Sequence, residues 1–165
     1  MIQIFKRLRA RPKENRSKAS GFTLLEVLMV IGILAILSTL VLVAINPARQ
    51  FKIARDSQRT SNVAAILSAI GQNLTDHSGQ FVCDGVVTQL PTDKTNMASG
   101  DGFDIGPCLV PDYISALPYD PSKTNGHWVD ETMYDTGYWI QTDAYGRVTI
   151  SADGEVSSTT ISVTR

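Results

Sequence analysis

One long apolar segment constrains the fold of this chain more than any other feature. From Phe22 to Ile45 the sequence runs for 24 residues with a single ionisable side chain, Glu26. As a helix rising about 1.5 Å per residue it would be about 36 Å long, more than the roughly 30 Å hydrocarbon core of a bilayer. A secretory signal has a shorter apolar core that ends at small residues, and Leu42-Val43-Ala44 does not fit that ending. The sequence therefore predicts a membrane-spanning helix.

Charge is sorted to the two sides of this span. Residues 1–20 carry seven Lys and Arg against one acid, a net charge of +6, whereas the sequence from Gly21 onward has a net charge of −7. Basic clusters resist translocation, so we expect the N-terminal side to stay in the cytoplasm and the C-terminal part to lie outside. Three basic residues also follow the span, Arg49, Lys52 and Arg55, but they are fewer than the seven that precede it. Because contacts to phosphates require a basic patch, the net charge of −7 from Gly21 onward disfavours nucleic-acid binding.

A helical pattern resumes after the apolar run. Pro47 should kink the helix, since proline lacks one backbone donor and clashes with the preceding turn. Apolar residues then recur at steps of three and four, at Val63, Ile66, Leu67, Ile70 and Leu74. This spacing predicts one apolar stripe on a helix that ends before Gly79. We expect a single bent helix over residues 22–74.

The rest of the chain alternates loops and strands. Residues 80–135 are rich in Gly, Pro, Asp, Asn and Thr, which predicts loops with short strands at 80–83 and 86–90. Three later segments, 136–142, 146–152 and 159–165, are rich in β-branched and aromatic residues and are separated by turn sequences. The expected fold class is α+β, with a long N-terminal α-helix packed on a C-terminal antiparallel β-sheet.

The start of the apolar run resembles a known processing signal. A basic leader, Gly21, Phe22, Thr23-Leu24-Leu25-Glu26 and an unbroken apolar segment closely resemble the N-terminal signature of type IV pilins and of the pseudopilins of type II secretion. The resemblance implies cleavage after Gly21 by a prepilin peptidase and N-methylation of Phe22. It divides the chain into a leader (1–21), a transmembrane and fibre-core helix (22–45) and an extracytoplasmic globular domain (46–165).

A carboxylate inside the span needs a physical reason, because a charge deep in a bilayer costs about 2.5 to 3.5 kcal/mol. Cleavage after Gly21 would create a cation, the α-amino group of Phe22, which has a pKa of about 8. Glu26 could pair with this amine in its own chain, one helical turn away, or with the amine of a neighbouring subunit, where it would set the axial offset. In the simpler alternative Glu26 reaches the headgroups. With Gly21-Phe22 upstream we favour a role in assembly.

Three further features are candidate sites. The resembling family has a helix-breaking proline in its long helix, so the chain around Pro47 either stretches in the polymer or is a simple kink. The only cysteines are Cys83 and Cys108, and we predict a disulfide between them rather than two free thiols. The bond would close a loop of about 25 residues and stabilise an exported domain by about 3 kcal/mol. Some pseudopilins bind calcium, for which Asp101, Asp104 and Asp112 are candidate ligands, but their spacing fits no EF-hand. We favour solvated acids and no cofactor.

No motif typical of a nucleophilic, phosphate-binding or zinc enzyme is present, so we predict a structural protein. The main hypothesis is a type IV pilus subunit that starts as a single-pass inner-membrane precursor. An assembly platform and its ATPase would polymerise it into an extracellular filament (fimbrium) for adhesion, twitching motility or DNA uptake. The alternatives are a type II secretion pseudopilin and a minor pilin. A rival of another class, a membrane-anchored binding or enzymatic domain, would keep the Gly21–Phe22 bond intact.

Overall fold

A computed structural model describes residues 21–156 and 159–165 and divides the chain after Ala44 into two compact units. The first unit contains all of helix α1 (Leu24–Ile45) except its last residue, and the side chains of this helix are all exposed. Its apolar residues lie on every side of the helix, which is typical of a helix made for a non-aqueous environment. The predicted leader, apart from Gly21, lies outside the described residues.

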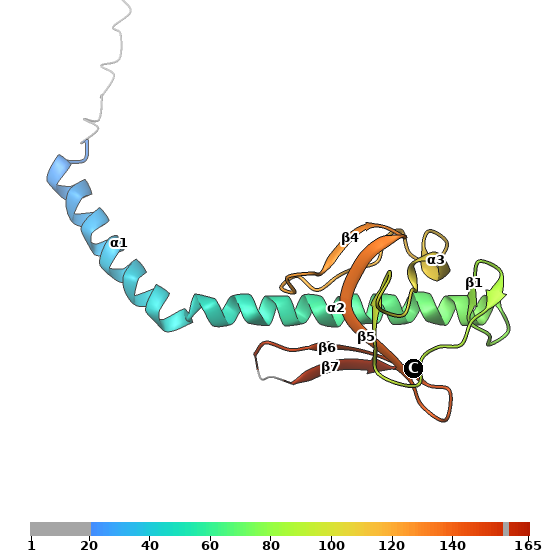
Figure 1. Cartoon of the computed structure of the whole chain (residues 1–165). Coiled ribbons are helices and arrows are strands. Elements are labelled where there is room, and N and C mark those ends of the chain that lie inside the picture. The colour runs from blue at the N-terminus through green and yellow to red at the C-terminus, as the bar shows by residue number, and fades with distance from the viewer. Residues whose placement is uncertain (1–20, 157–158) are drawn as a thin grey trace, which may run out of the picture. The chain divides into compact units, whose positions relative to one another are not determined.

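Helix α2 (Pro47–Asp76) follows α1 in the chain and belongs to the second unit (Figure 1). Asn46 is the single residue between the two helices. Asn46 has φ 48° and ψ 78°, a left-handed conformation that Asn tolerates better than most residues, and its side chain accepts a hydrogen bond from the N–H of Arg49. Pro47 occupies the first turn, where its missing N–H costs nothing. The predicted bend is therefore a break, at which one helix ends and another begins.

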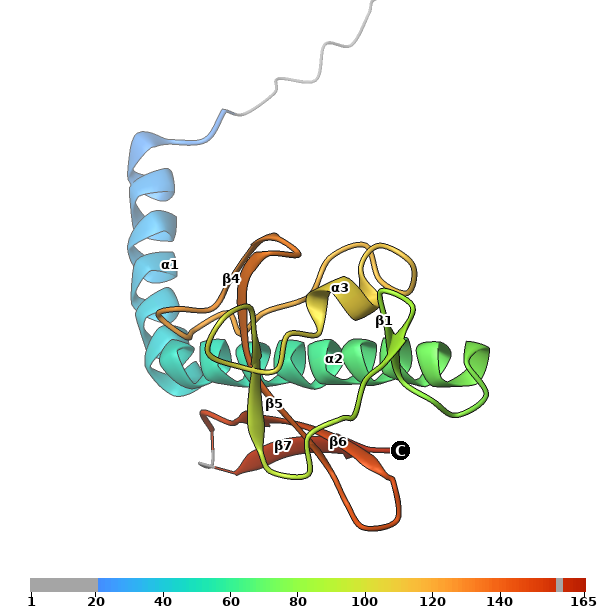
Figure 2. The same cartoon turned by 45° about the vertical axis from the view of Figure 1, so that its right-hand side comes forward.

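The sheet beside α2 is antiparallel, with the strand order β3-β5-β6-β7 and with β4 also paired to β5 (Figure 2). Its strands are β3 (Thr95–Ala98), β4 (His127–Asp130), β5 (Met133–Thr142), β6 (Val148–Asp153) and β7 (Thr160–Thr164). The last three match the three segments predicted from composition. A two-stranded hairpin, β1 (Val82–Cys83) and β2 (Val86–Val87), and the short helix α3 (Gly106–Leu109) complete the unit.

The expectation of loops over 80–135 was incomplete, because this region also holds β3, β4 and α3. These elements are short, and their formation depends on pairing with distant chain segments. Thr95 pairs with Ile140 and His127 pairs with Asp135, both across to β5. Local composition carries no signal for such pairing, since strand preference depends strongly on the packing context.

The core lies between α2 and the sheet. The predicted stripe on α2 supplies Val63, Ile66, Leu67 and Ile70, all buried, with Leu74 half-buried at its edge. Helix α2 packs on β6 and β7, and the buried residues Ile140 and Ile150 face each other across β5 and β6. The stripe begins only at Val63, so the first four turns of α2 need other contacts to hold them to the domain.

Candidate processing and assembly site

The predicted cleavage site lies at the start of α1. Gly21 and Phe22 precede the helix and are exposed. Thr23 follows, and its hydroxyl accepts a hydrogen bond from the N–H of Glu26 (3.2 Å), while its carbonyl accepts one from the N–H of Val27 (3.2 Å). Thr23 thus acts as the N-cap, and Glu26 lies three residues on, the T-x-x-E order of a capping box. Sequence reasoning missed this cap, although the order alone could have revealed it.

Glu26 is an exposed carboxylate on an otherwise apolar helix surface. It lies in the first turn of α1, where the helix dipole favours negative charge. Beside it a hollow of about 250 Å³ is lined by Phe22, Glu26, Val27, Val30 and Ile31. A cation placed there would meet one carboxylate and aliphatic side chains. The chain itself places Phe22 four residues before Glu26, about one turn away.

Helix α1 is long and apolar enough to cross a membrane, with a mean hydropathy of 3.0. Its hydroxyl groups are satisfied within the helix, since Ser38 donates to the carbonyl of Leu34 (2.7 Å) and Thr39 to that of Ala35 (2.9 Å). This pairing removes the cost of leaving a polar group unpaired in hydrocarbon. The helix is therefore suited to lipid or to contact with other apolar helices.

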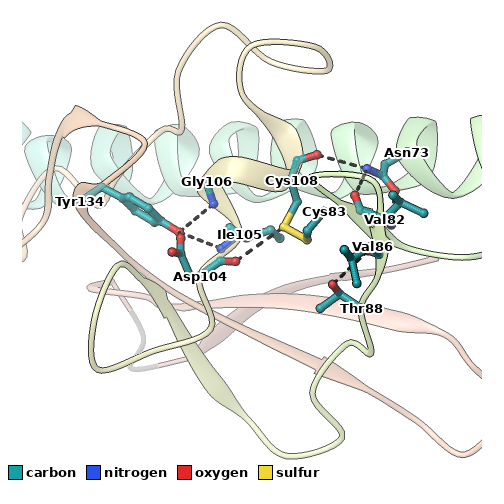
Figure 3. Close-up of a disulfide and its surroundings, with 10 residues drawn as sticks. All are labelled: Asn73, Val82, Cys83, Val86, Thr88, Asp104, Ile105, Gly106, Cys108 and Tyr134. Carbon is teal, nitrogen blue, oxygen red and sulfur yellow. Dashed lines mark hydrogen bonds between the residues drawn. A yellow bond between two sulfur atoms is a disulfide. The ribbon is translucent and has the colours of Figure 1, made fainter.

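A disulfide joins Cys83 in β1 to Cys108 in α3, as the sequence predicted (Figure 3). The bond ties the β1–β2 hairpin to α3, and Asn73 on α2 reinforces it. The Asn73 amide donates to the carbonyls of Val82 (2.8 Å) and Cys108 (3.1 Å), and its oxygen accepts the N–H of Val82 (2.9 Å). One buried amide and one disulfide thus hold three segments together at the C-terminal end of α2.

The three aspartates considered for calcium are exposed and do not form a common site. Asp104 instead accepts a hydrogen bond from the hydroxyl of Tyr134 (2.7 Å), whose oxygen accepts the N–H groups of Ile105 (2.7 Å) and Gly106 (2.8 Å). Burial, and then the nearby Asp104 carboxylate, raise the pKa of Tyr134. Over residues 21–156 and 159–165 no group of three or more His, Cys, Asp and Glu side chains is placed to hold a metal ion.

A buried arginine, which no sequence pattern predicted, holds the first part of α2. Arg59 is only 2% exposed. It donates two hydrogen bonds to Asp120 (2.8 and 2.9 Å), one to Asp56 (2.7 Å) and one to Glu155 (2.7 Å). These partners come from α2, from the loop before β4 and from the β6–β7 turn. Arg55 adds a bond from Nε to Glu155 (2.8 Å), so α2 is clamped to two other segments.

The charges of this cluster stabilise one another. Hydrogen bonding to Arg55 and Arg59 holds the pKa of Glu155 well below its usual value. Burial alone would raise the pKa values of Asp56 and Asp120, but hydrogen bonds outweigh burial and hold both below the ordinary range. The hydrogen bonds come from the N–H groups of Glu155 and Val156 for Asp56, and chiefly from Arg59 for Asp120. All three carboxylates are therefore ionised at neutral pH.

The structure thus groups the predicted residues in two places, with Gly21, Phe22 and Glu26 at the start of α1 and the two cysteines at the far end of α2. No curated protein and no solved structure shows a significant match to the chain. One family description, the prokaryotic N-terminal methylation motif, matches residues 16–42, which include Gly21, Phe22 and Glu26. The chain therefore carries the signature of type IV pilin and pseudopilin precursors, followed by an apolar helix and an α+β domain.

Proposed function

We propose that this chain is the precursor of a type IV pilus subunit. It is inserted in the inner membrane through α1, cut between Gly21 and Phe22, methylated on the amine of Phe22 and polymerised into a helical filament. The observation that carries the proposal is the methylation motif at residues 16–42, which overlaps an exposed apolar helix with one carboxylate in its first turn. The signature is typical of structural subunits, so we expect no catalytic role.

The exposed surface of α1 supports polymerisation. Its large apolar side chains are 48 to 86% exposed in the single chain, and none of its residues is buried. Such a surface is stable in lipid or against other apolar helices but not in water. Lipid covers α1 before assembly. In a filament that has left the membrane, only the α1 helices of other subunits offer equivalent cover.

Glu26 would set the position of each subunit along this bundle. Inside the bundle its charge is costly unless a cation neutralises it, and the methylated amine of a neighbouring Phe22 is such a cation. The hollow of about 250 Å³ beside Glu26 is otherwise apolar, which strengthens an ion pair formed there. A shift of one subunit along the bundle would break the pair, so the pair selects one register.

Mass spectrometry of filaments sheared from the cell surface tests the processing. We expect an abundant N-terminal peptide that begins with N-methylated Phe22. Detection of the chain only in the envelope, processed but absent from sheared filaments, would favour a type II secretion pseudopilin. An uncut Gly21–Phe22 bond in cells with an active prepilin peptidase would refute the proposal and favour an anchored domain.

Glu26→Gln tests the pairing, because it keeps the shape of the side chain and removes its charge. Expressed without a wild-type copy and confirmed as processed, this variant should form few or no filaments. Thr39→Val in the same helix is the matched control and should assemble normally, since the Thr39 hydroxyl bonds only within α1. Normal filament yield from Glu26→Gln would show that another contact aligns the subunits.

A further inference from the structure

A row of four basic residues follows one side of α2. Arg49, Lys52, Arg55 and Arg59 are spaced by three, three and four residues, so their side chains share one face of the helix. The domain supplies acids for two of them. Arg55 pairs with Glu155, and Arg59 pairs with Asp56, Asp120 and Glu155. The two residues at the C-terminal end of the row are therefore already paired with carboxylates of the domain.

Arg49 and Lys52, at the other end of the row, are exposed and have no acid of their own. Across residues 21–156 and 159–165 no carboxylate lies within 4.0 Å of either charge. Both line a hollow of about 260 Å³ with Asn46, Ala48, Val156 and Glu155. Glu155 does not neutralise them, because its carboxylate oxygens already accept from Arg55 and Arg59. Two cations therefore remain available to an external anion.

An aromatic side chain lies between these two cations in the sequence. Phe51 is 65% exposed and takes no part in the hydrophobic core of the domain. Phe side chains on helices that lie at a membrane surface are buried at the boundary between headgroups and acyl chains. An exposed ring and two unpaired cations within one turn of helix are the composition expected of a segment that rests on a membrane surface.

These three residues also lie close to the membrane along the chain. Since α2 is helical from Pro47, Lys52 is about 9 Å along the helix from Asn46, and thus within about 13 Å of Ile45 whatever direction α2 takes. The polar layer on each side of the hydrocarbon is about 5 to 8 Å thick. Long basic side chains therefore reach lipid phosphates from these positions.

We propose that Arg49, Phe51 and Lys52 form a membrane-surface contact with anionic phospholipid on the outer side of the inner membrane. Arg49 and Lys52 bind lipid phosphate groups, and Phe51 inserts at the boundary between headgroups and acyl chains. This inference rests on the proposed function, because it requires a precursor that is inserted in the membrane through α1. It adds a second attachment, beyond α1, that each subunit has to release when it leaves the lipid for a filament.

Lipid retention by the full, uncut chain tests the contact without requiring cleavage or assembly. The chain is placed in nanodiscs of equal phosphatidylglycerol and phosphatidylcholine, released into detergent, and its retained lipids are identified by native mass spectrometry. The basic leader also attracts anionic lipid, but the lipid that it retains should be the same in every variant because the leader is not changed. Arg49→Gln/Lys52→Gln is compared with Lys94→Gln/Lys123→Gln, which removes two exposed charges held over Trp139.

We expect Arg49→Gln/Lys52→Gln to lower the preference for phosphatidylglycerol by about fivefold for each charge lost, as expected for basic residues near an anionic surface. The control pair should change it little. Phe51→Ser should reduce the total lipid retained but not the preference. Equal retention by the two double variants would overturn the proposal. Displacement of the lipid by 10 mM inorganic phosphate would do so too, because it would indicate a site for small anions.

Filament yield separates this contact from one between subunits. If Arg49→Gln/Lys52→Gln retained phosphatidylglycerol normally but failed to form filaments, the two cations would pair with acids of a second copy, and the lipid contact would be refuted. If retention fell while the Gly21–Phe22 bond proved never to be cut, the lipid contact would stand and the pilus function would fall.

Discussion

The stability of the globular domain should depend strongly on Arg59. Replacing it by Met keeps a long side chain but removes every donor. Asp56 would still accept the N–H groups of Glu155 and Val156, and Glu155 would still pair with Arg55. Asp120 would lose Arg59, the one cation paired with it among the described residues. It is 5% exposed and would keep only the N–H and hydroxyl of Ser122.

The expected loss of unfolding free energy follows from the buried Asp120 carboxylate, which is left without a cation. Removing one partner of a buried ion pair typically costs about 3 to 5 kcal/mol, a large part of the roughly 5 to 15 kcal/mol by which a domain is stable. Arg59→Met/Asp120→Leu should recover much of the loss, because it removes both charges. Arg147→Met is the matched control. Its partner, Asp143, lies four residues earlier in the turn between β5 and β6, and the Arg147 side chain is exposed, so this variant should stay close to the wild type.

The contribution of Asp120 to the unfolding free energy should change with pH in opposite directions in the wild type and in Arg59→Met. In the wild type the folded-state pKa values of Asp56, Asp120 and Glu155 lie below their unfolded values. Their contribution is therefore complete near neutral pH and is lost as the pH falls through about 4 and lower. In Arg59→Met burial should raise the pKa of Asp120, so protonation relieves the penalty. The difference in unfolding free energy should be largest at pH 7 and shrink by pH 4.

Urea unfolding of the full chain in detergent micelles measures these differences, followed by the fluorescence of Trp128 and Trp139, both of which lie in the globular domain. A loss below about 1 kcal/mol at pH 7, or a loss that stays constant between pH 7 and pH 4, would refute the view that a buried, charged cluster holds α2.

Three further changes test other parts of the domain. Cys83→Ala/Cys108→Ala should lower the unfolding free energy by about 3.5 kcal/mol, the loop-entropy value for a closure of 25 residues, and reduction of the wild type should reproduce that loss in urea titrations. Tyr134→Phe leaves two buried N–H groups unpaired and should cost about 1 to 3 kcal/mol in the same assay. Asn46→Ala should speed hydrogen exchange in the first turn of α2, whereas Asn46→Gly should do so less, because glycine tolerates the positive φ.

Features that depend on residues close together in the chain could be predicted from the sequence. The apolar run of α1 needs no partner in its own chain to be recognised, and the stripe on α2 follows helical spacing. The strands β5, β6 and β7 carry dense β-branched and aromatic residues. The disulfide follows from two cysteines in a segment expected outside the cytoplasm. In each case the local pattern and the final structure agree, as natural sequences generally require.

Features that depend on distant partners could not be predicted. Arg59 lies in the polar stretch Asp56-Ser57-Gln58-Arg59-Thr60, which alone indicates a solvated helix face. Its burial follows from Asp120 and Glu155, which are 61 and 96 residues away. Strand β3 and the hydroxyl of Tyr134 depend in the same way on segments about 30 to 45 residues apart. Such contacts are set by packing, where tertiary context overrides local preference.

The charged cluster around Arg59 also limits where the domain can lie relative to the membrane. The first four turns of α2 lack the apolar stripe that holds the later turns, and ion pairs and hydrogen bonds take its place. An apolar junction there could enter lipid without any penalty for burying charge. A cluster of ionised groups could not, because hydrocarbon penalises charge by several kcal/mol. The charges therefore favour a position of α2 outside the hydrocarbon from Arg55 onward, and in the membrane-inserted precursor that we propose the cluster that fastens α2 to the sheet would also limit how deeply the chain can enter the bilayer.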